Sequence, residues 1–363
     1  MMVVSKQQKI FFDFLRFCIG SAEEVPVSLK EADWKELYRI AQKQCLVGVL
    51  FDGIRKLPAE HVGMKKELLL QWMAESQMLA KANIRLNDAA IQVSEWFRKK
   101  GFRTCILKGQ GNTLMYPNGL HRTPGDIDIW VEGGDKRVIS FVRSISPHEK
   151  ACYHHIEFPS YKGVEVEVHY RPSFLQCFWH NRRLQKYYGM VKEEQFSHRV
   201  MLGEQGEIAI PTVEFNLIFQ LTHIYAHLMN EGIGLRQLLD YYFVLLHADM
   251  KDVAELQRNL KHIGIWKFAS AIMYIMQEVF GMPVSRLIVP PNEKYGKFVL
   301  NEVLEAGNFG KYDDRNHFGK SQIGHNLQRV YRDIRLVRYF PAEALSEPIF
   351  RTWHFFWRIW AHG

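Results

Sequence analysis

The stretch that decides the fold runs from Arg122 to Trp130 and reads Arg-Thr-Pro-Gly-Asp-Ile-Asp-Ile-Trp. From Asp126 to Val131, charged and apolar side chains alternate, as they do in a β-strand with one polar and one apolar face. Side chains two positions apart share a face, so Asp126 and Asp128 are expected to project together, about 7 Å apart. Two carboxylates on one face repel each other unless a cation neutralises them. The stretch therefore predicts a strand that presents a cation site.

Other segments with strand character lie on both sides of this strand. Residues 102–107 are mostly apolar and lead into Lys108-Gly109-Gln110. Residues 164–170 alternate strictly, with valines on one face and Glu165, Glu167 and His169 on the other. Gly133-Gly134 is expected to turn the chain into a helix around 136–144. Strands and helices that alternate in this way predict a small α/β core.

The segments outside this core have helical periodicity. Residues 28–31 have the form of a capping box, in which the serine and glutamate side chains each bond a free backbone N–H. We expect this box to start a helix through Trp34. A longer helix is expected over about 64–100, with Gly101 to end it. Beyond Pro211, helical periodicity returns, first over residues 212–229 and then over 235–248.

We therefore expect an α+β protein with a small mixed β-sheet core and flanking helices. The predicted domains are an N-terminal helical region over 1–100, the α/β core over 101–210 and a C-terminal helical region over 211–363.

Lys and Arg outnumber Asp and Glu by 47 to 39, which gives a net charge of +8. Residues 315–363 hold eight basic and three acidic residues, so this tail contributes +5. Such a surplus is compatible with a nucleic acid, nucleotide or anionic membrane partner but does not require one.

The five cysteines include no Cys-x-x-Cys pair, which argues against a disulfide framework and for a reducing compartment. The first twenty residues have an amphipathic pattern rather than that of a signal peptide. No segment approaches the roughly 20 apolar residues that span a bilayer. A cytoplasmic location and no transmembrane segment are expected.

The oxygen ligands of Asp126 and Asp128 suit Mg²⁺, which takes one or two protein carboxylates and completes its shell with water and phosphates. A third carboxylate from a neighbouring strand would complete a two-metal clamp for phosphoryl transfer. Taken alone, an Asp-x-Asp at a strand end is more often a solvated turn, and Lys-Gly is usually a simple strand exit. The order of the three segments favours an active site.

These motifs resemble those of the nucleotidyltransferase superfamily related to DNA polymerase β. More closely, they resemble a branch of uncharacterised bacterial nucleotidyltransferases with a Leu-Lys-Gly turn, an Arg-x-x-Gly-Asp-Ile-Asp strand and an acidic-x-His-[Trp/Tyr] strand. The resemblance is close over about 100–175 and looser at Arg236–Asp240. It implies that the mixed β-sheet core is of the nucleotidyltransferase type. The sequence differs at Gln110, where the superfamily prefers Gly or Ser, and has fifteen residues between Gln110 and Asp126.

The resemblance implies that Asp126, Asp128 and Glu167 are the catalytic residues and hold two Mg²⁺ ions. Glu167 is chosen as the third carboxylate because it stands two residues before His169, and it would help to deprotonate the acceptor hydroxyl. Glu165 shares its face and is the alternative.

The resemblance also implies that Lys108, Gly109, Gln110 and Arg122 bind the nucleoside triphosphate. Gly109 allows the backbone to approach phosphate oxygens, and Lys108 supplies a point charge. The alternatives are a surface lysine for Lys108 and an ion pair with an aspartate for Arg122.

Two further pairs of residues have both a structural and a functional interpretation. His223 and His227 share a helix face, where packed or partner-bonded histidines are favoured over a metal site. Arg236 and Asp240 are expected to form an ion pair along a helix, with substrate contact as the alternative.

The tail carries a basic stripe followed by aromatic residues: Arg329, Arg332, Arg335, Arg338, Phe350, Trp353, Phe355, Phe356, Trp357 and Trp360. This composition suits nucleic acid or a membrane surface, although such aromatics more often belong to a core or an interface. Asp333 is expected to pair with a neighbouring arginine, which favours a structural tail.

The sequence thus predicts a Mg²⁺-dependent enzyme that moves a nucleoside monophosphate from an NTP to a hydroxyl on a protein, an RNA or a small molecule. The alternative is a non-catalytic nucleotide- or nucleic-acid-binding protein on the same fold. A weaker third interpretation is one half of a toxin-like two-component system. Nucleic acid is not the favoured partner.

Overall fold

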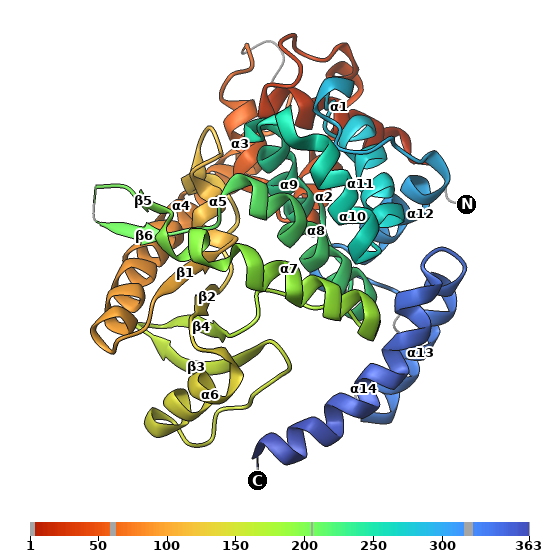
Figure 1. Cartoon of the computed structure of the whole chain (residues 1–363). Coiled ribbons are helices and arrows are strands. Elements are labelled where there is room, and N and C mark those ends of the chain that lie inside the picture. The colour runs from red at the N-terminus through yellow and green to blue at the C-terminus, as the bar shows by residue number, and fades with distance from the viewer. Residues whose placement is uncertain (1–3, 59–62, 205, 316–321, 363) are drawn as a thin grey trace.

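The alternating segments of the sequence form a four-stranded mixed sheet (Figure 1). In chain order the strands are β1 (Thr104–Leu107), β2 (Ile127–Val131), β3 (His155–Tyr161) and β4 (Val164–His169). Their order in the sheet is β1-β2-β4-β3, with β2 parallel to β4 and the other two pairs antiparallel. The α+β class with a small mixed sheet is thus confirmed.

The computed structural model describes residues 4–58, 63–204, 206–315 and 322–362. Helices precede, interrupt and follow the sheet along the chain. The elements before it are α1 (Lys6–Ile19), η1 (Val27–Glu31), α2 (Trp34–Gln44), α3 (Val47–Ile54) and α4 (Lys66–Lys99). Those within and just after it are α5 (Gly109–Thr113), η3 (Gly119–His121), α6 (Gly134–Ile145), α7 (Phe178–Ser197) and the hairpin β5 (Arg199–Met201) and β6 (Glu207–Ala209).

The elements that complete the fold are α8 (Val213–Asn230), α9 (Leu235–His247), η4 (Met250–Asp252), α10 (Val253–Ile263), α11 (Trp266–Glu278), η5 (Val284–Arg286), α12 (Glu293–Ala306), η6 (Asn308–Gly310), α13 (Gln322–Val337) and α14 (Pro341–His362). None of the helices in the described ranges is long and apolar enough to cross a membrane.

The sheet has one apolar face and one face that carries the acidic residues. Ile127, Ile129 and Val131 of β2 join the valines of β4 in a buried cluster with α4 and α6. Because side chains alternate along a strand, Asp128 and Glu167 lie on the opposite face. The register of the two parallel strands places these two residues directly beside each other.

The N-terminal and C-terminal helices share one hydrophobic core, although the sheet separates them in sequence. Phe11, Leu37, Phe219, Leu239 and Ile272 are all buried in this core. Figure 1 shows α1 to α3 beside α9, α11 and α12 at one end of the molecule, with the sheet toward the other end. The division into three sequence domains stays a prediction.

A buried ion pair fixes the chain just before β2. Arg122 donates from Nε and Nη2 to the two carboxylate oxygens of Asp240 on α9, both at 2.8 Å. The hydroxyl of Tyr116 donates to the same carboxylate at 2.7 Å. Arg236, one turn earlier on α9, donates to the carbonyl of Thr123 at 3.1 Å. The ion pair expected between Arg236 and Asp240 is therefore replaced by contacts of each with the segment that leads into β2.

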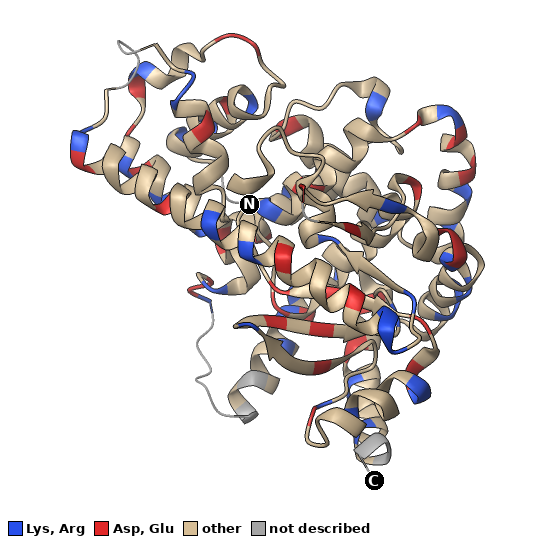
Figure 2. Ribbon diagram, turned by 90° about the vertical axis from the view of Figure 1, so that its left-hand side faces the viewer, with Lys and Arg blue, Asp and Glu red and all other residues tan. Residues whose placement is uncertain are grey.

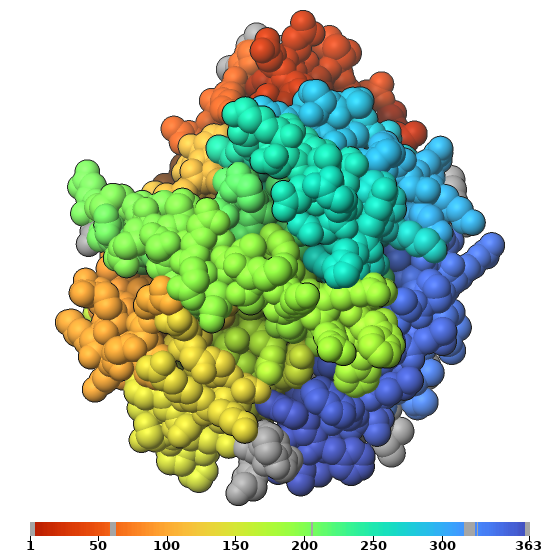
Figure 3. Space-filling model, in the orientation of Figure 1, coloured from red at the N-terminus to blue at the C-terminus, as the bar shows by residue number. Residues whose placement is uncertain are grey.

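The α13–α14 hairpin lies against the middle of the chain, as Figure 3 shows where the blue segment meets the yellow-green one. Glu343 of α14 accepts hydrogen bonds from the backbone N–H groups of Gln176 and Cys177, at 2.6 and 3.1 Å. These groups lie at the start of α7, where backbone donors have no partner within the helix. Phe350 stacks on Phe174 with ring centroids 5.2 Å apart.

Three of the four arginines of the predicted stripe contact the protein itself. Arg332 is buried and donates to the backbone carbonyls of residues 230 and 231. Arg335 pairs with Glu302 at 3.2 Å, and Arg329 lies 3.9 Å from Glu347. These contacts favour the structural interpretation of the stripe.

The expected pairing of Asp333 with an arginine was wrong. Both of its carboxylate oxygens are buried and lack a hydrogen-bond partner among the residues that the structure describes. Burial and the nearby Glu347 carboxylate raise the pKa of Asp333 to about 7.

The aromatic residues of α14 differ in their exposure. Phe355 and Phe356 are exposed, whereas Trp357 packs partly against the apolar cluster of the sheet. The side chain of Trp360 lies outside the described part.

The expected bounds of α4, about 64–100, agree with the observed helix. Gly101 follows its end and has a φ of +80°. The capping box was wrong. Residues 27–31 form a separate 3₁₀ helix, and the Ser28 hydroxyl donates to Asp13 at 3.0 Å. Asp33 caps α2 instead, because its carboxylate accepts from the backbone N–H groups of Lys35 and Glu36.

The sequence did not predict β3, α7 or the β5–β6 hairpin. β3 lies at the edge of the sheet and contains Pro159, which lacks the N–H of a central strand residue. Its side chains are mostly exposed or half-buried, so no apolar alternation marks it.

Breaking the pair before β2 is expected to destabilise the fold. Asp240→Asn leaves the Arg122 guanidinium buried without its counter-charge, which typically costs about 3–5 kcal/mol. Glu207→Gln is the matched control, because Glu207 pairs with Arg199 on the surface and such pairs contribute about 0–1 kcal/mol. Urea denaturation measures the free energy of unfolding of both variants. Equal losses would contradict the stabilising role of the Arg122–Asp240 pair.

Candidate active site

The three predicted carboxylates come together at the polar face of the sheet. Asp126 immediately precedes β2, Asp128 lies within β2, and Glu167 lies directly beside Asp128 on β4. Asp128 is 2% exposed and Glu167 is 33% exposed. Figure 2 shows acidic residues on neighbouring strands of the sheet. Glu165 is exposed and lies nearer the start of β4.

The carboxylates of β2 affect each other's ionisation. The neighbouring charge of Asp128, together with burial, raises the pKa of Asp126 to about 6. Burial also acts to raise the pKa of Asp128, but the Lys108 charge and a hydrogen bond from His169 outweigh it and hold that pKa well below its usual range. Of the three carboxylates, Asp126 is thus the one whose charged form is disfavoured, since the pKa values of Asp128 and Glu167 are lowered.

Lys108 occupies a strained turn between β1 and α5. Its φ is +40°, which is uncommon for a residue other than glycine, and Gly109 follows with a φ of +41°. The turn directs the Lys108 ammonium to the carboxylate of Asp128, 3.0 Å away, and it also donates to Nε2 of His223 at 3.0 Å. Lys108 is thus a half-buried charge beside the carboxylates rather than a surface lysine at a strand end.

Two residues that the resemblance assigned to triphosphate binding lie away from the cavity. The Gln110 side chain is buried and donates to Asn87 of α4. Arg122 is held by Asp240, so the alternative of an ion pair with an aspartate describes its position.

A cavity of about 230 Å³ lies over the carboxylates, and α8 and η6 provide its far wall. Its lining consists of Lys108, Asp126, His154, His155, Glu167, His169, Ser173, Phe174, His223, Ala226, His227, Asn230, Glu231 and Phe309. On the other side of Asp126 a second opening of about 280 Å³ includes Arg85, Lys162 and Glu165.

The histidines of the cavity make specific contacts. His223 accepts from Lys108, and His227 Nδ1 lies 2.5 Å from the Glu231 carboxylate, so the prediction of partner-bonded histidines is confirmed. Burial opposes a charge on His169, but hydrogen bonds to Asp128 and Glu167 outweigh it and raise the pKa of His169 to about 9.

The sequence did not single out His154 and His155. Burial and the neighbouring His169 lower the pKa of His155 to about 4. The consecutive histidines were visible in the sequence, but they lie at the start of the edge strand, which lacked a recognisable pattern.

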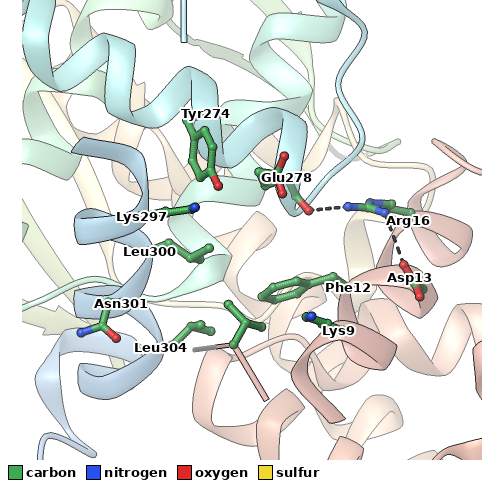
Figure 4. Close-up of a pocket in the computed structure, with 11 residues that line it drawn as sticks. Lys9, Phe12, Asp13, Arg16, Tyr274, Glu278, Lys297, Leu300, Asn301 and Leu304 are labelled. Carbon is green, nitrogen blue, oxygen red and sulfur yellow. Dashed lines mark hydrogen bonds and ion pairs between the residues drawn. The ribbon is translucent and has the colours of Figure 1, made fainter. Parts of the chain in front are cut away.

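A larger cavity, of about 500 Å³, lies between α1, α11 and α12 (Figure 4). Lys9, Arg16 and Lys297 face it together with Asp13 and Glu278. The Arg16 guanidinium is already bonded to Asp13 and to the backbone carbonyl of Glu278. The smaller cavity is the candidate active site, because Asp126 and Glu167 line it beside the buried Asp128, and the charge of Asp128 raises the pKa of Asp126.

Comparison with known protein families identifies the family of this chain. The model of a family described as uncharacterised nucleotidyltransferase matches residues 30–281. The chain belongs to this family. The matched region of this nucleotidyltransferase contains all four strands of the sheet together with α8 and α9. Neither the curated proteins nor the solved structures gave a match.

Family membership gives the general reaction, transfer of a nucleotide from a nucleoside triphosphate. The more specific likeness to the DNA polymerase β branch stays a prediction. The donor set of the site fits a divalent cation, because Asp128 and Glu167 offer carboxylate oxygens within 4.8 Å of each other.

Neutralising Asp126 is expected to stabilise the nucleotidyltransferase at high pH. Because its pKa is about 6 in the fold against a usual 3.8, the folded state binds the proton more tightly than the unfolded state. As the pH falls through 6 towards 4, protonation of Asp126 therefore raises the free energy of unfolding by up to about 3 kcal/mol. Above pH 6 this contribution is absent.

In chelator-containing buffer, Asp126→Asn should melt above wild type at pH 7–8, and the difference should disappear as pH approaches 4. Glu165→Gln on the exposed part of the same face is the control and should change stability by about 0.5 kcal/mol or less. A lower stability of Asp126→Asn at pH 8 would contradict the crowding of charge at this site.

Proposed function

We propose that the protein transfers a nucleoside monophosphate from an NTP to an acceptor hydroxyl, with two Mg²⁺ ions held by Asp126, Asp128 and Glu167. The observation that carries this proposal is the pairing of Asp128 with Glu167 across β2 and β4, with Asp126 and Glu167 in the lining of one cavity. Carboxylates buried at such close range need a cation to be stable together.

When bound, the cations polarise the α-phosphate and stabilise the charge that develops on the attacking and leaving oxygens. The acceptor oxygen forms a bond to the α-phosphorus, and the bond to the bridging oxygen breaks to release pyrophosphate. Glu167 receives the proton of the acceptor hydroxyl, a role that its 33% exposure and its position in the cavity wall permit.

Lys108 and Gly109 are the proposed contacts of the triphosphate. The Lys108 ammonium already lies within the carboxylate cluster and supplies a positive charge at the point where phosphates would enter. Gly109 brings the backbone close to the start of β2, since a Cβ there would lie 3.7 Å from the Asp126 carbonyl oxygen. A direct triphosphate contact of Gln110 or Arg122 stays a prediction, and their bonds to α4 and α9 favour a positioning role.

The acceptor is a protein side chain, an RNA end or a small hydroxylated molecule. Both openings beside Asp126 carry cations, Lys108 on one side and Arg85 and Lys162 on the other, so an anionic substrate is attracted from either side. Incubation of the protein with labelled NTPs and cell extract identifies the acceptor by its label.

The metal site is tested by Asp126→Asn combined with Asp128→Asn. We expect this double variant to lose Mg²⁺-dependent transfer, because both proposed ligands lose their charge, while it remains folded in a thermal melt. Labelling that persists in the double variant would refute the mechanism. Binding of nucleotide or nucleic acid that depends on salt but not on Mg²⁺ would favour the non-catalytic alternative.

The choice of base is tested by comparing Glu167→Gln with Glu165→Gln. Glu167→Gln should lower kcat far more than it raises the Kd for NTP, because a base acts in the transition state. Glu165→Gln, which removes a carboxylate from the same face of β4, should leave kcat near that of wild type. A larger loss of kcat in Glu165→Gln would show that the wrong member of the pair was chosen.

A further inference from the structure

Three imidazole rings converge beside the carboxylates. His155 begins β3 and is the register partner of His169 on β4, and His154 directly precedes it. The ring centroids of His154 and His155 are 4.4 Å apart, and each lies 5.3 Å from that of His169. One nitrogen of each ring lies within 4.8 Å of the others.

The separations are those of ligands around one ion. Nε2 of His154 faces Nδ1 of His155 at 3.1 Å. Two nitrogens bound at 2.0–2.1 Å to one tetrahedral ion lie about 3.4 Å apart. Glu167 is next to the same group, with its Oε2 atom 3.4 Å from Nδ1 of His155 and 3.3 Å from Nε2 of His169.

Nε2 of His169 faces the carboxylates of Asp128 and Glu167 at 2.9 and 3.3 Å, so an ion bound there would replace its proton. Nδ1 of the same ring lies 3.3 Å from the backbone carbonyl of Arg171. A metal-bound histidine commonly makes such a bond from its other ring nitrogen. Nδ1 of His154 is buried and has no hydrogen-bond partner among the described residues, so hydrogen bonds within this part of the chain leave that ring unsatisfied.

From this geometry we infer that His154, His155 and His169 hold a first-row transition-metal dication of the Zn²⁺ class, beside the carboxylate site proposed for Mg²⁺. Imidazole nitrogen suits such ions, whereas Mg²⁺ prefers oxygen. Glu167 lies between the two positions. The inference rests on the proposed function for the ion's place next to the base, whereas its binding is measured independently of transfer.

A second group of metal-ligand types, Cys177, His180 and Glu343, lacks this character. Both oxygens of Glu343 are already engaged, one by His180 at 2.9 Å and the other by the backbone donors at the start of α7. Hydrogen bonds within the fold therefore account for that group.

The experiment is a titration of the full-length, chelator-treated protein with Co²⁺ in the presence of excess Mg²⁺, followed by optical absorption. We expect one Co²⁺ to bind with the spectrum of nitrogen ligation, to be displaced by Zn²⁺ and to resist Mg²⁺. His154→Gln and His155→Gln should each weaken binding by more than the roughly 10- to 100-fold that the loss of an outer-shell partner costs. His227→Gln, in the same cavity but outside the cluster, is the matched control and should bind Co²⁺ as wild type does.

X-ray absorption of the wild-type Co²⁺ complex gives a second measurement that needs no variant. Imidazole scattering in the first shell supports the inference, whereas an oxygen-only shell or displacement by Mg²⁺ overturns it. The two proposals fail separately: histidine-ligated Co²⁺ without nucleotide transfer would refute the enzyme, and Mg²⁺-dependent transfer without histidine ligation would refute this metal site.

Discussion

Two carboxylates side by side on neighbouring strands impose the constraint that the rest of the cavity meets. The register of β2 and β4 places Asp128 next to Glu167, and Asp126, immediately before β2, lines the same cavity as Glu167. Buried like charges are unstable unless positive groups surround them. Lys108 and His169 supply part of that charge through contacts of 3.0 and 2.9 Å with Asp128. The remaining demand, expressed in the raised pKa of Asp126, is what makes the site suitable for cations and for the phosphates that bind them.

The helical regions hold this arrangement in place. Three helices fix the segment before β2. Asp240 of α9 pairs with Arg122, and Asn83 of α4 donates to the carbonyl of Arg122 at 2.7 Å. At the end of α2, the carbonyl of Cys45 accepts from the Thr123 hydroxyl at 2.7 Å. Helix α8 provides the wall of the cavity that faces the sheet. The small sheet thus carries the carboxylates, while helices from both ends of the chain fix their entry and enclose the space above them.

Local patterns in the sequence predicted the carboxylates, because strand alternation alone determines that Asp126 and Asp128 share a face with each other. The helices α4, α8 and α9 were likewise predicted from a local pattern, the helical periodicity of their apolar residues. Contacts between distant segments were beyond such patterns: Arg122 and its partner Asp240 are 118 positions apart. The orientation of Gln110 toward α4 and the convergence of His154 with His169 likewise depend on packing and on a strand register that no local pattern specifies.

A crystal structure of the protein with Mn²⁺ and a non-hydrolysable NTP analogue tests the central claim most directly. The account predicts anomalous density for Mn²⁺ in contact with Asp126, Asp128 and Glu167, with the triphosphate over the turn of Lys108 and Gly109. Nucleotide bound in the larger cavity between α1, α11 and α12, with no metal at the carboxylates, would contradict it.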